Sequence, residues 1–300
     1  MSVNRTEFYT SVSESARYTL GPFLKNGDVV FQPTAGPTAD YNQNWLLVDS
    51  NYATNAAGWV SIGTKPFAIY SGGTVTPSEA GSISTIDHAT YSGNSIVVYP
   101  TNNAAFTTFI DSGDGLDGVF NLKPFGGTLD TINVQFNNLT EFDMTGLTAL
   151  VELMLQNNSI GGSFSANSSS ALEYIDLSFN AYTSFDGNGL TALTYLDLSG
   201  NPITNLVAGN MGAGGFSLTL TGCTNLITLD VSSVTNLTSL YATGNALSSA
   251  SVNNTLTNLA WFGLSNGVID LSGGTSATTN AAGSAAVQTL VSRGWYVGHN

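Results

Sequence analysis

Charged residues, and basic ones above all, are scarce in this chain. Only 9% of its 300 residues are Asp, Glu, Lys or Arg, whereas about 25% is usual in soluble domains. Six basic residues stand against twenty acidic ones, and no Lys or Arg occurs between Leu129 and Ser292. Phosphate backbones and anionic membrane surfaces are bound by clustered Lys and Arg. We therefore expect no nucleic-acid partner and no attraction to an anionic membrane.

Cysteine, histidine and long apolar runs are also rare. The single cysteine, Cys223, excludes a disulfide within the chain. No apolar run reaches the roughly 18 residues of a membrane span, and "MSVNRTEFYTSVSESARYTL" lacks the apolar core of a secretory signal. We expect no membrane insertion and no cofactor. We also expect a chain that stays in the cell that makes it or leaves without a classical signal.

Motifs for hydrolysis and metal binding are weak. No G-x-S-x-G, H-E-x-x-H or P-loop pattern occurs, and His88 and His299 lie far apart in the sequence. The stretch "DSGDGLDG" offers Asp111, Asp114 and Asp117 as candidate calcium ligands. Its spacing is not that of an EF-hand, so we interpret these residues as parts of acidic turns.

The strongest positive feature is an internal repeat of the form L-x-x-L-x-L-x-x-N-x-L. Its six copies start 21 or 22 residues apart, and the fifth is weakened at both ends. They are "LDTINVQFNNL", "LVELMLQNNSI", "LEYIDLSFNAY", "LTYLDLSGNPI", "GFSLTLTGCTN" and "LTSLYATGNAL". Such a period predicts a solenoid, in which each coil buries its apolar side against the next.

Each position of the repeat has an expected structural role. The L-x-L part has the period of a strand, so Leu196 and Leu198 should point inward while Tyr195, Asp197 and Ser199 face solvent. The ten or so residues between strands, such as "TSFDGNGLTA", are too short and rich in Gly for regular helices. "LITLDVSSVT" predicts a second strand on the convex side.

The Asn of the repeat predicts a ladder. Where the chain leaves the strand, buried backbone groups need partners, which a short amide supplies. The ladder positions are Asn137, Asn158, Asn180, Asn201, Cys223 and Asn245. For Cys223 we prefer a buried structural role to that of a reactive thiol.

These repeats resemble the short leucine-rich repeats of BspA-like and internalin J-like surface proteins, from Leu129 to about Leu247. The segments "NGVIDLSGG" and "LVSRGWYV" are similar to the terminus of leucine-rich proteins of tailed bacteriophages. The resemblance implies a protein that binds at a surface.

The expected fold is β-rich and mixed, with four parts. Residues 1–100 form an antiparallel β domain for anchoring, 101–128 cap the solenoid, 129–250 form it, and 251–300 are an α/β cap. In this cap, Ser251 is the expected N-cap of a helix that ends at Gly263 and has Trp261 on or near its apolar face.

Outward strand positions carry aromatic and acidic residues that suit sugar stacking or a protein contact. The residues of this stripe are Phe136, Glu152, Met154, Tyr174, Asp176, Phe179, Tyr195, Asp197, Phe216 and Tyr241. Asp176 and Asp197 should lie about 4.8 Å apart on adjacent strands, near the carboxylate separation of retaining glycosidases. An open sheet has no cleft to raise one pKa, which disfavours catalysis.

The leading hypothesis is a non-enzymatic protein on the virion surface of a tailed phage, either a tail or fibre component or a capsid decoration protein. Its N-terminal domain would dock to other virion proteins, and its solenoid would meet a host surface protein or glycan. Homo-oligomers remain compatible with this hypothesis. The alternatives are a bacterial cell-surface leucine-rich-repeat adhesin and a glycan depolymerase that uses Asp176 and Asp197.

Overall fold

The computed structural model describes residues 127–166, 169–212 and 214–300, together with short strands earlier in the chain and the side chain of Phe109. The chain divides into two units, Met1–Ala149 and Leu150–Asn300, which we describe separately. The candidate stripe lies almost entirely in the second unit. Asp111, Asp114 and Asp117, the candidate calcium ligands that we interpret as parts of acidic turns, have side chains outside the described residues.

The first unit changes from antiparallel to parallel pairing along the chain. One antiparallel sheet has the order β1-β6-β3-β4, and β2 pairs antiparallel with β5 and β7. Parallel pairs follow, β7 with β9 and β8 with β10. The bounds are β1 Leu46–Val48, β2 Trp59–Ser61, β3 Phe67–Ser71, β4 Thr74–Pro77, β5 Thr85–Asp87, β6 Ile96–Pro100, β7 Thr108–Asp111, β8 Asp117–Phe120, β9 Thr131–Asn133 and β10 Asn138–Phe142.

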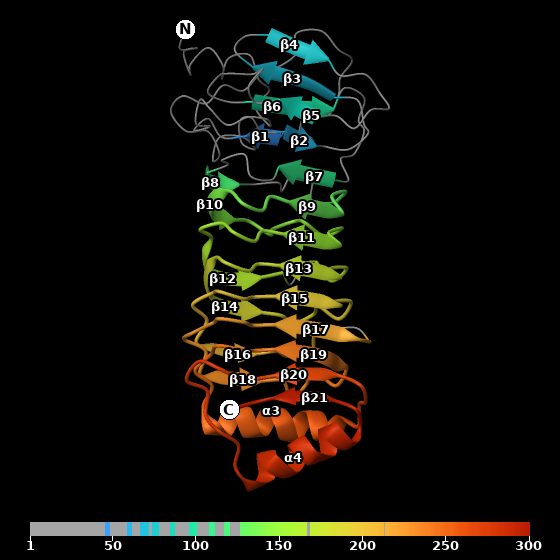
Figure 1. The fold of residues 1–300 in the computed structure, drawn as a ribbon. Helices are drawn as coiled ribbons and strands as arrows, with labels where there is room; N and C mark the ends of the chain where they lie inside the picture. The colour runs from blue at the N-terminus through green and yellow to red at the C-terminus, as the bar shows by residue number, and fades with distance from the viewer. Residues whose placement is uncertain are drawn as a thin grey trace. The chain divides into compact units, whose positions relative to one another are not determined.

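The second unit is a stack of coils that share one parallel sheet, here called the main sheet (Figure 1). Its strands, in spatial order, are β11 Glu152–Met154, β13 Tyr174–Asp176, β15 Tyr195–Asp197, β17 Phe216–Thr219, β19 Leu237–Tyr241, β20 Val268–Asp270 and β21 Tyr296–Gly298. The expected fold class, a parallel-sheet solenoid with few helices, is confirmed.

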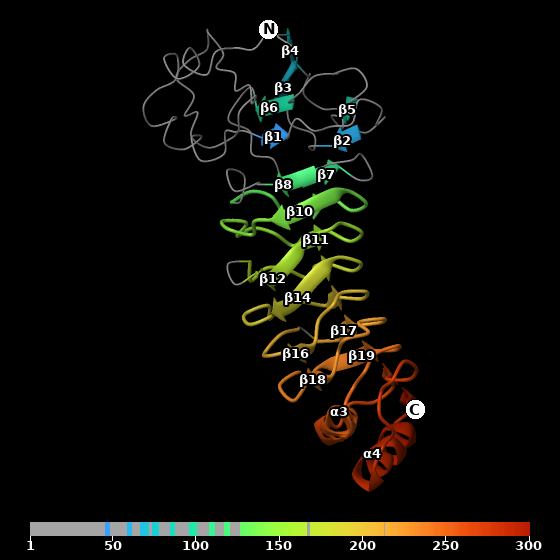
Figure 2. The same cartoon turned by 90° about the vertical axis from the view of Figure 1, so that its left-hand side faces the viewer.

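Short back strands run on the opposite side of the coils (Figure 2). They pair parallel as β12 Gly161–Ser165 with β14 Ala181–Asp186, and β16 Asn205–Val207 with β18 Thr228–Asp230. The strand expected within "LITLDVSSVT" is β18. The backs of these coils are extended because about ten residues, many of them Gly, Thr or Asn, cannot build a regular helix.

The core follows from the period-two pattern of the strands. The central residue of each main strand points inward and stacks on its in-register neighbour, as Ile175 does on Leu153 and on Leu196. All three side chains are fully buried. Full burial of one such side chain contributes about 1.5–3 kcal/mol, so the leucine column supplies much of the stability.

Each coil turns out of the main sheet through one residue in the left-handed region. This position is occupied by Asn157, Phe179, Gly200, Gly222 and Gly244, with φ between 53° and 73°. Phe136 has the same conformation in the first unit, with φ of 56°. The next residue in sequence is the ladder residue, so the turn directs the ladder side chain into the coil.

Ladder amides connect consecutive coils. The Nδ2 of Asn201 donates to the carbonyl oxygens of Leu198 in its own coil and Leu177 in the preceding one, each at 2.9 Å. Its Oδ1 accepts from the backbone N–H of Tyr182 at 3.0 Å. Asn180 repeats this arrangement with Leu155, Leu177 and the N–H of Ile160. One amide therefore satisfies backbone groups that the turn would otherwise bury without partners.

The helices α3 Ser249–Phe262 and α4 Ala281–Ser292 cover the C-terminal end of the second unit. The N-cap of α3 is Ser248 and not Ser251 as expected from the sequence. The hydroxyl of Ser251 is buried and exchanges hydrogen bonds with the backbone of Leu229. Gly263 ends the helix with φ of 76° as expected, whereas Trp261 is 86% exposed and does not join the apolar face.

Removal of a ladder amide should destabilise the solenoid strongly. Asn201→Ala leaves two buried carbonyl groups and one N–H without this partner, so we expect a loss of about 3 kcal/mol in the free energy of unfolding. The exposed Asn205→Ala on β16 is the matched control, with a change within about 0.5 kcal/mol. Urea unfolding measures both, and equal losses would contradict the role of the ladder.

A side chain at Gly200 in the closing turn should destabilise the protein. The φ of 70° at this glycine disfavours any Cβ by about 1–2 kcal/mol, and that atom would lie only 2.7 Å from Cδ1 of Phe179. We expect Gly200→Ala to destabilise the protein, and to do so less in a Phe179→Gly background, where the steric part disappears. The same cost in both backgrounds, measured by urea unfolding, would show that the Phe179 ring does not constrain this turn.

Candidate binding face

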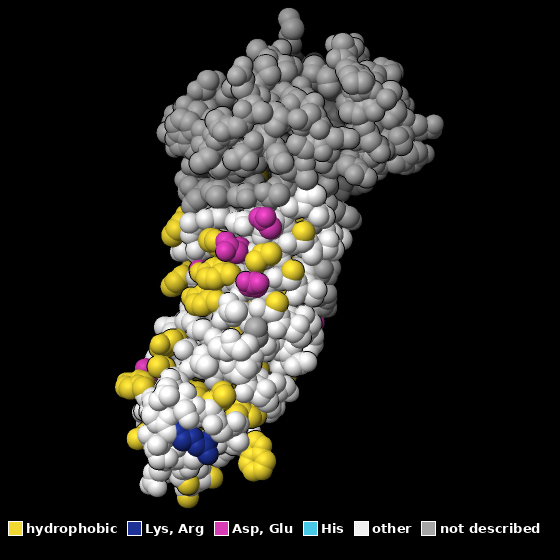
Figure 3. Space-filling view, turned by 90° about the vertical axis from the view of Figure 1, so that its right-hand side faces the viewer, with side chains coloured by type: hydrophobic (Ala, Val, Ile, Leu, Met, Phe, Trp, Pro, Cys, Tyr) yellow, Lys and Arg dark blue, Asp and Glu magenta, His cyan; other side chains and the backbone are white. Residues whose placement is uncertain are grey.

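Two in-register columns of side chains point outward from the main sheet, and together they are called the binding face. The first column is Glu152, Tyr174, Tyr195, Ser217, Ser239, Val268 and Tyr296. The second column is Met154, Asp176, Asp197, Thr219, Tyr241, Asp270 and Gly298. Figure 3 shows acidic and hydrophobic side chains side by side on one face of the described surface.

A pair of stacked tyrosines lies in the first column. The ring centroids of Tyr174 and Tyr195 are 4.7 Å apart and the ring planes differ by 8°. This separation matches the spacing of about 4.8 Å between neighbouring strands, so the rings stack face to face across β13 and β15, and both side chains are half-buried. The hydroxyl of Tyr195 donates to Oδ2 of Asp197 at 3.2 Å.

The electrostatic surroundings keep both tyrosine hydroxyls protonated. Burial raises the pKa of Tyr174, and the charges of Asp176, Asp197 and Glu152 raise it further. Burial likewise raises the pKa of Tyr195, with Asp197 as the next largest cause. These hydroxyls are therefore hydrogen-bond donors at neutral pH and are not bases.

Asp176 is not the exposed stripe residue that we expected. It is only 8% exposed, and its Oδ1 accepts from the N–H and the hydroxyl of Ser178 at 2.9 and 2.7 Å. Burial raises the pKa of its carboxyl, while the two bonds from Ser178 oppose that shift. The carboxylate caps the turn that follows β13, which is a structural role.

The same aspartate turn recurs along the second unit. Asp197, Asp230 and Asp270 accept from the N–H of the residue two positions later, at 2.8 to 3.0 Å. Ser199, expected in solvent, is 5% exposed. The sequence signal for these turns is D-x-S, present in "DLS" and "DVS" of four coils, which the interpretation of Asp as a surface residue missed.

Asp176 and Asp197 are direct partners in the parallel register, but both carboxylates are used locally. Oδ1 of each caps a turn, and Oδ2 of Asp197 accepts from Tyr195. His299, the histidine within the described residues, bonds to Asn300 at the end of the chain. The arrangement thus offers capped carboxylates and rigid aromatic rings, which suit binding better than proton transfer.

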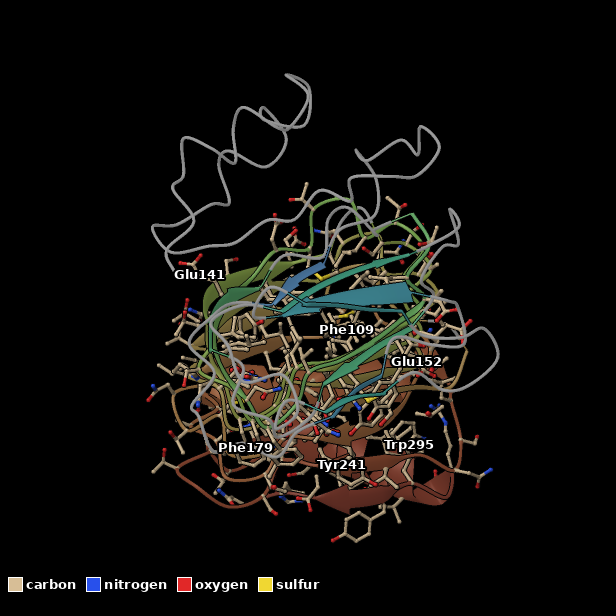
Figure 4. All side chains as sticks on the ribbon, turned by 90° about the horizontal axis from the view of Figure 1, so that it is seen from above. Phe109, Glu141, Glu152, Phe179, Tyr241 and Trp295 are labelled. Atoms are coloured by element: carbon tan, nitrogen blue, oxygen red, sulfur yellow. The ribbon has the colours of Figure 1, made fainter. Side chains whose placement is uncertain are left out.

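Three aromatic residues of the expected stripe occupy other places. Phe136 and Phe179 are in the closing turns, where they are 56% and 60% exposed, and not on strand positions. Phe216 is fully buried because the register shifts beside it, and a Cβ on Gly212 would lie 2.7 Å from its Cγ. Glu152, Phe179 and Tyr241, labelled in Figure 4, are all exposed.

Met154 is half-buried in the second column, and Tyr241 is 39% exposed there. The sequence interpretation overlooked Tyr296, which is exposed at the far end of the first column, as well as Val207 and Ile227 on the back of the coils. The signal for Tyr296 is its place between the apolar residues Trp295 and Val297, which gives the alternation of a strand.

The remaining ladder residues make the following contacts. Asn137, Asn158 and Asn245 each donate to the carbonyl oxygen three residues earlier, and Asn245 also to Leu220 of the preceding coil. The thiol of Cys223 contacts the carbonyl oxygen of Leu198 at 3.2 Å. Burial raises the pKa of this thiol to about 11, so it is protonated and unreactive at neutral pH.

Two further searches of the described residues gave negative results. No group of three or more His, Cys, Asp or Glu side chains in this part of the chain could hold a metal ion. None of its helices has the length and apolar character needed to cross a membrane.

Residues 192–212 match the Leucine Rich Repeat family model. The match covers one coil, and the register and closing turns of the neighbouring coils repeat its pattern as a leucine-rich-repeat solenoid. Similar solved structures include the functional domain of InlJ from Listeria monocytogenes, with 21% identity and a TM-score of 0.37 over 58% of this chain and 45% of that one. Another is the internalin InlF of L. monocytogenes strain 4b F2365, with 18% identity and a TM-score of 0.32 over 65% and 68%. No curated protein matches the sequence.

The buried carboxyl of Asp176 should reduce stability at neutral pH. Since its folded-state pKa is raised, the unfolded chain releases the proton first, and stability falls as pH rises from the ordinary value of 3.8 through the folded pKa. Asp176→Asn retains the Oδ1 acceptor without the charge. We expect the change in the free energy of unfolding caused by this substitution, measured by urea unfolding, to be more favourable at pH 7 than at pH 3. The same change at both pH values would contradict this expectation.

Proposed function

We propose that this leucine-rich-repeat protein is a non-enzymatic binding protein, displayed at a surface, whose binding face recognises a protein or glycan partner. The observation that carries the proposal is the stacked Tyr174–Tyr195 pair, held on a rigid sheet beside Glu152 and Asp197. Rigid tyrosines bury much area at small entropic cost, which makes them frequent anchors of interfaces.

Other features of the face support binding in preference to catalysis. A depolymerase would require Asp176 and Asp197 as a catalytic carboxylate pair. Both carboxylates instead accept hydrogen bonds from the turns that follow their strands. Ser217, Ser239 and Thr219, which occupy other outward positions, are small and polar. They leave the aromatic and acidic residues as the distinctive groups of the face.

Two surfaces are candidates for the display of this protein. The likeness of the C-terminal sequence to leucine-rich proteins of tailed phages supports the virion surface, where residues 1–100 would dock to other virion proteins. The second candidate is a bacterial cell-surface adhesin, which the repeat length of 21 or 22 residues favours. Gold-labelled antibodies against residues 150–300 distinguish the two on purified phage particles and on the producing bacteria. Labelling of neither surface would contradict display.

The binding face is tested by a double variant, Tyr174→Ser with Tyr195→Ser, on an array of bacterial surface proteins and glycans. Loss of two aromatic anchors should weaken binding to the responding partner at least about tenfold. The control is Val207→Ser with Ile227→Ser, which alters exposed apolar residues on the back of the coils. If the control lost binding and the tyrosine variant kept it, the partner would occupy another surface.

A further inference from the structure

The Glu152 end of the binding face holds charges without a basic partner among the described residues. Glu152 is exposed and lies directly in register with Tyr174. Asp176 and Asp197 follow on the next two strands of the second column. Arg293, the one basic residue of the described part besides the histidine, donates to the carbonyl oxygen of Ala260 in the C-terminal cap. The carboxylates of the face thus have no cation of their own in this part of the chain.

The tyrosine stack leaves one ring face of Tyr174 turned toward these charges. Its other face is taken by Tyr195 on β15. Because the strand order is β11-β13-β15, the remaining face is directed to β11, which carries Glu152 at the opposed position. Glu152 is exposed and its side chain is long, so its carboxylate can reach a cation placed on this face of the Tyr174 ring.

We infer that this position binds the guanidinium or ammonium group of an Arg or Lys side chain from a partner protein. An aromatic face attracts cations through its quadrupole, and a carboxylate beside it adds a charge-assisted hydrogen bond. The partner is therefore a protein with a basic surface segment. The inference rests on the proposed function and names the partner class of the same face.

A glycan fits this position less well. Sugar rings stack on open aromatic faces, but here the two tyrosine rings cover one face of each other. The free face of Tyr174 is opposed by a carboxylate, which favours a cation over a neutral C–H surface. A chain with twenty acidic and six basic residues also attracts basic partners at long range.

The test uses the full chain and two fluorescein-labelled peptides, one of alternating Gly and Arg and one with the neutral isostere citrulline at each Arg. Fluorescence anisotropy at physiological salt gives the Kd values. The Arg peptide should bind more tightly than the citrulline peptide. Tyr174→Leu should weaken its binding about twofold to fivefold, and Glu152→Gln about threefold. Tyr174→Phe, which keeps the aromatic ring, should leave the Kd nearly unchanged.

Asp230→Asn is the matched control, because it removes one charge on β18 and keeps the Oδ1 acceptor of its turn. Circular dichroism verifies that each variant is folded. If Asp230→Asn and Glu152→Gln weakened binding equally, the overall negative charge of the chain would explain the binding, and the inference would be overturned. Indifference to citrulline, or equal Kd values for Tyr174→Leu and Tyr174→Phe, would also overturn it.

The array experiment separates this inference from the proposed function. The tyrosine double variant could lose its partner while the protein binds the Arg and citrulline peptides equally well. That result would support the proposed binding face and overturn the inference of a cationic partner. If the responding partner is a glycan, the face binds sugar and the inference is again overturned. If the double variant keeps its partner, the proposed function itself fails.

Discussion

The amide of the ladder asparagine is the interaction on which the rest of the second unit depends. Each coil leaves the main sheet through a left-handed turn, which points backbone carbonyl groups into an apolar interior. Asn180 and Asn201 satisfy these groups in their own coil and in the preceding one, so a single side chain fixes both the turn and the distance between coils. The in-register stacking of Ile175 and Leu196, and hence of the outward residues, follows from this connection.

The same constraint determines which residues are free to recognise a partner. The inward positions are filled by leucine and isoleucine, and the aspartates of the second column accept hydrogen bonds in the turns that precede the ladder. In the proposed function, recognition uses the first column, where Tyr174 and Tyr195 stack at the spacing of the strands and Glu152 precedes them in register. A repeat that is uniform in its architecture thereby produces one distinctive patch, because only a few outward positions differ from coil to coil.

The repeat made the solenoid predictable, since leucine spacing and strand alternation are both local properties of the chain. Three errors arose because the alternation of the strands does not take specific side-chain contacts into account. Phe216 replaces a missing leucine because Gly212 leaves room for its ring, and a register shift turns it inward. Asp176 is buried by its turn with Ser178. Ser248 rather than Ser251 begins α3 because the hydroxyl of Ser251 is held by Leu229 of another coil. The first two contacts are local in the sequence, and the D-x-S spacing is a signal for the second; only the bond between Ser251 and Leu229 joins different coils.

Hydroxyl-radical footprinting tests the central claim most directly, because it measures the solvent accessibility of individual aromatic side chains in the free and bound protein. Pepsin suits the digestion, since Lys and Arg are absent from Leu129 to Ser292. If a partner occupies the binding face, oxidation of Tyr174, Tyr195 and Met154 should fall on binding, while that of the exposed Trp261 in the cap should stay unchanged. Protection of Trp261 with unchanged oxidation of the two tyrosines would place the partner elsewhere and contradict the account.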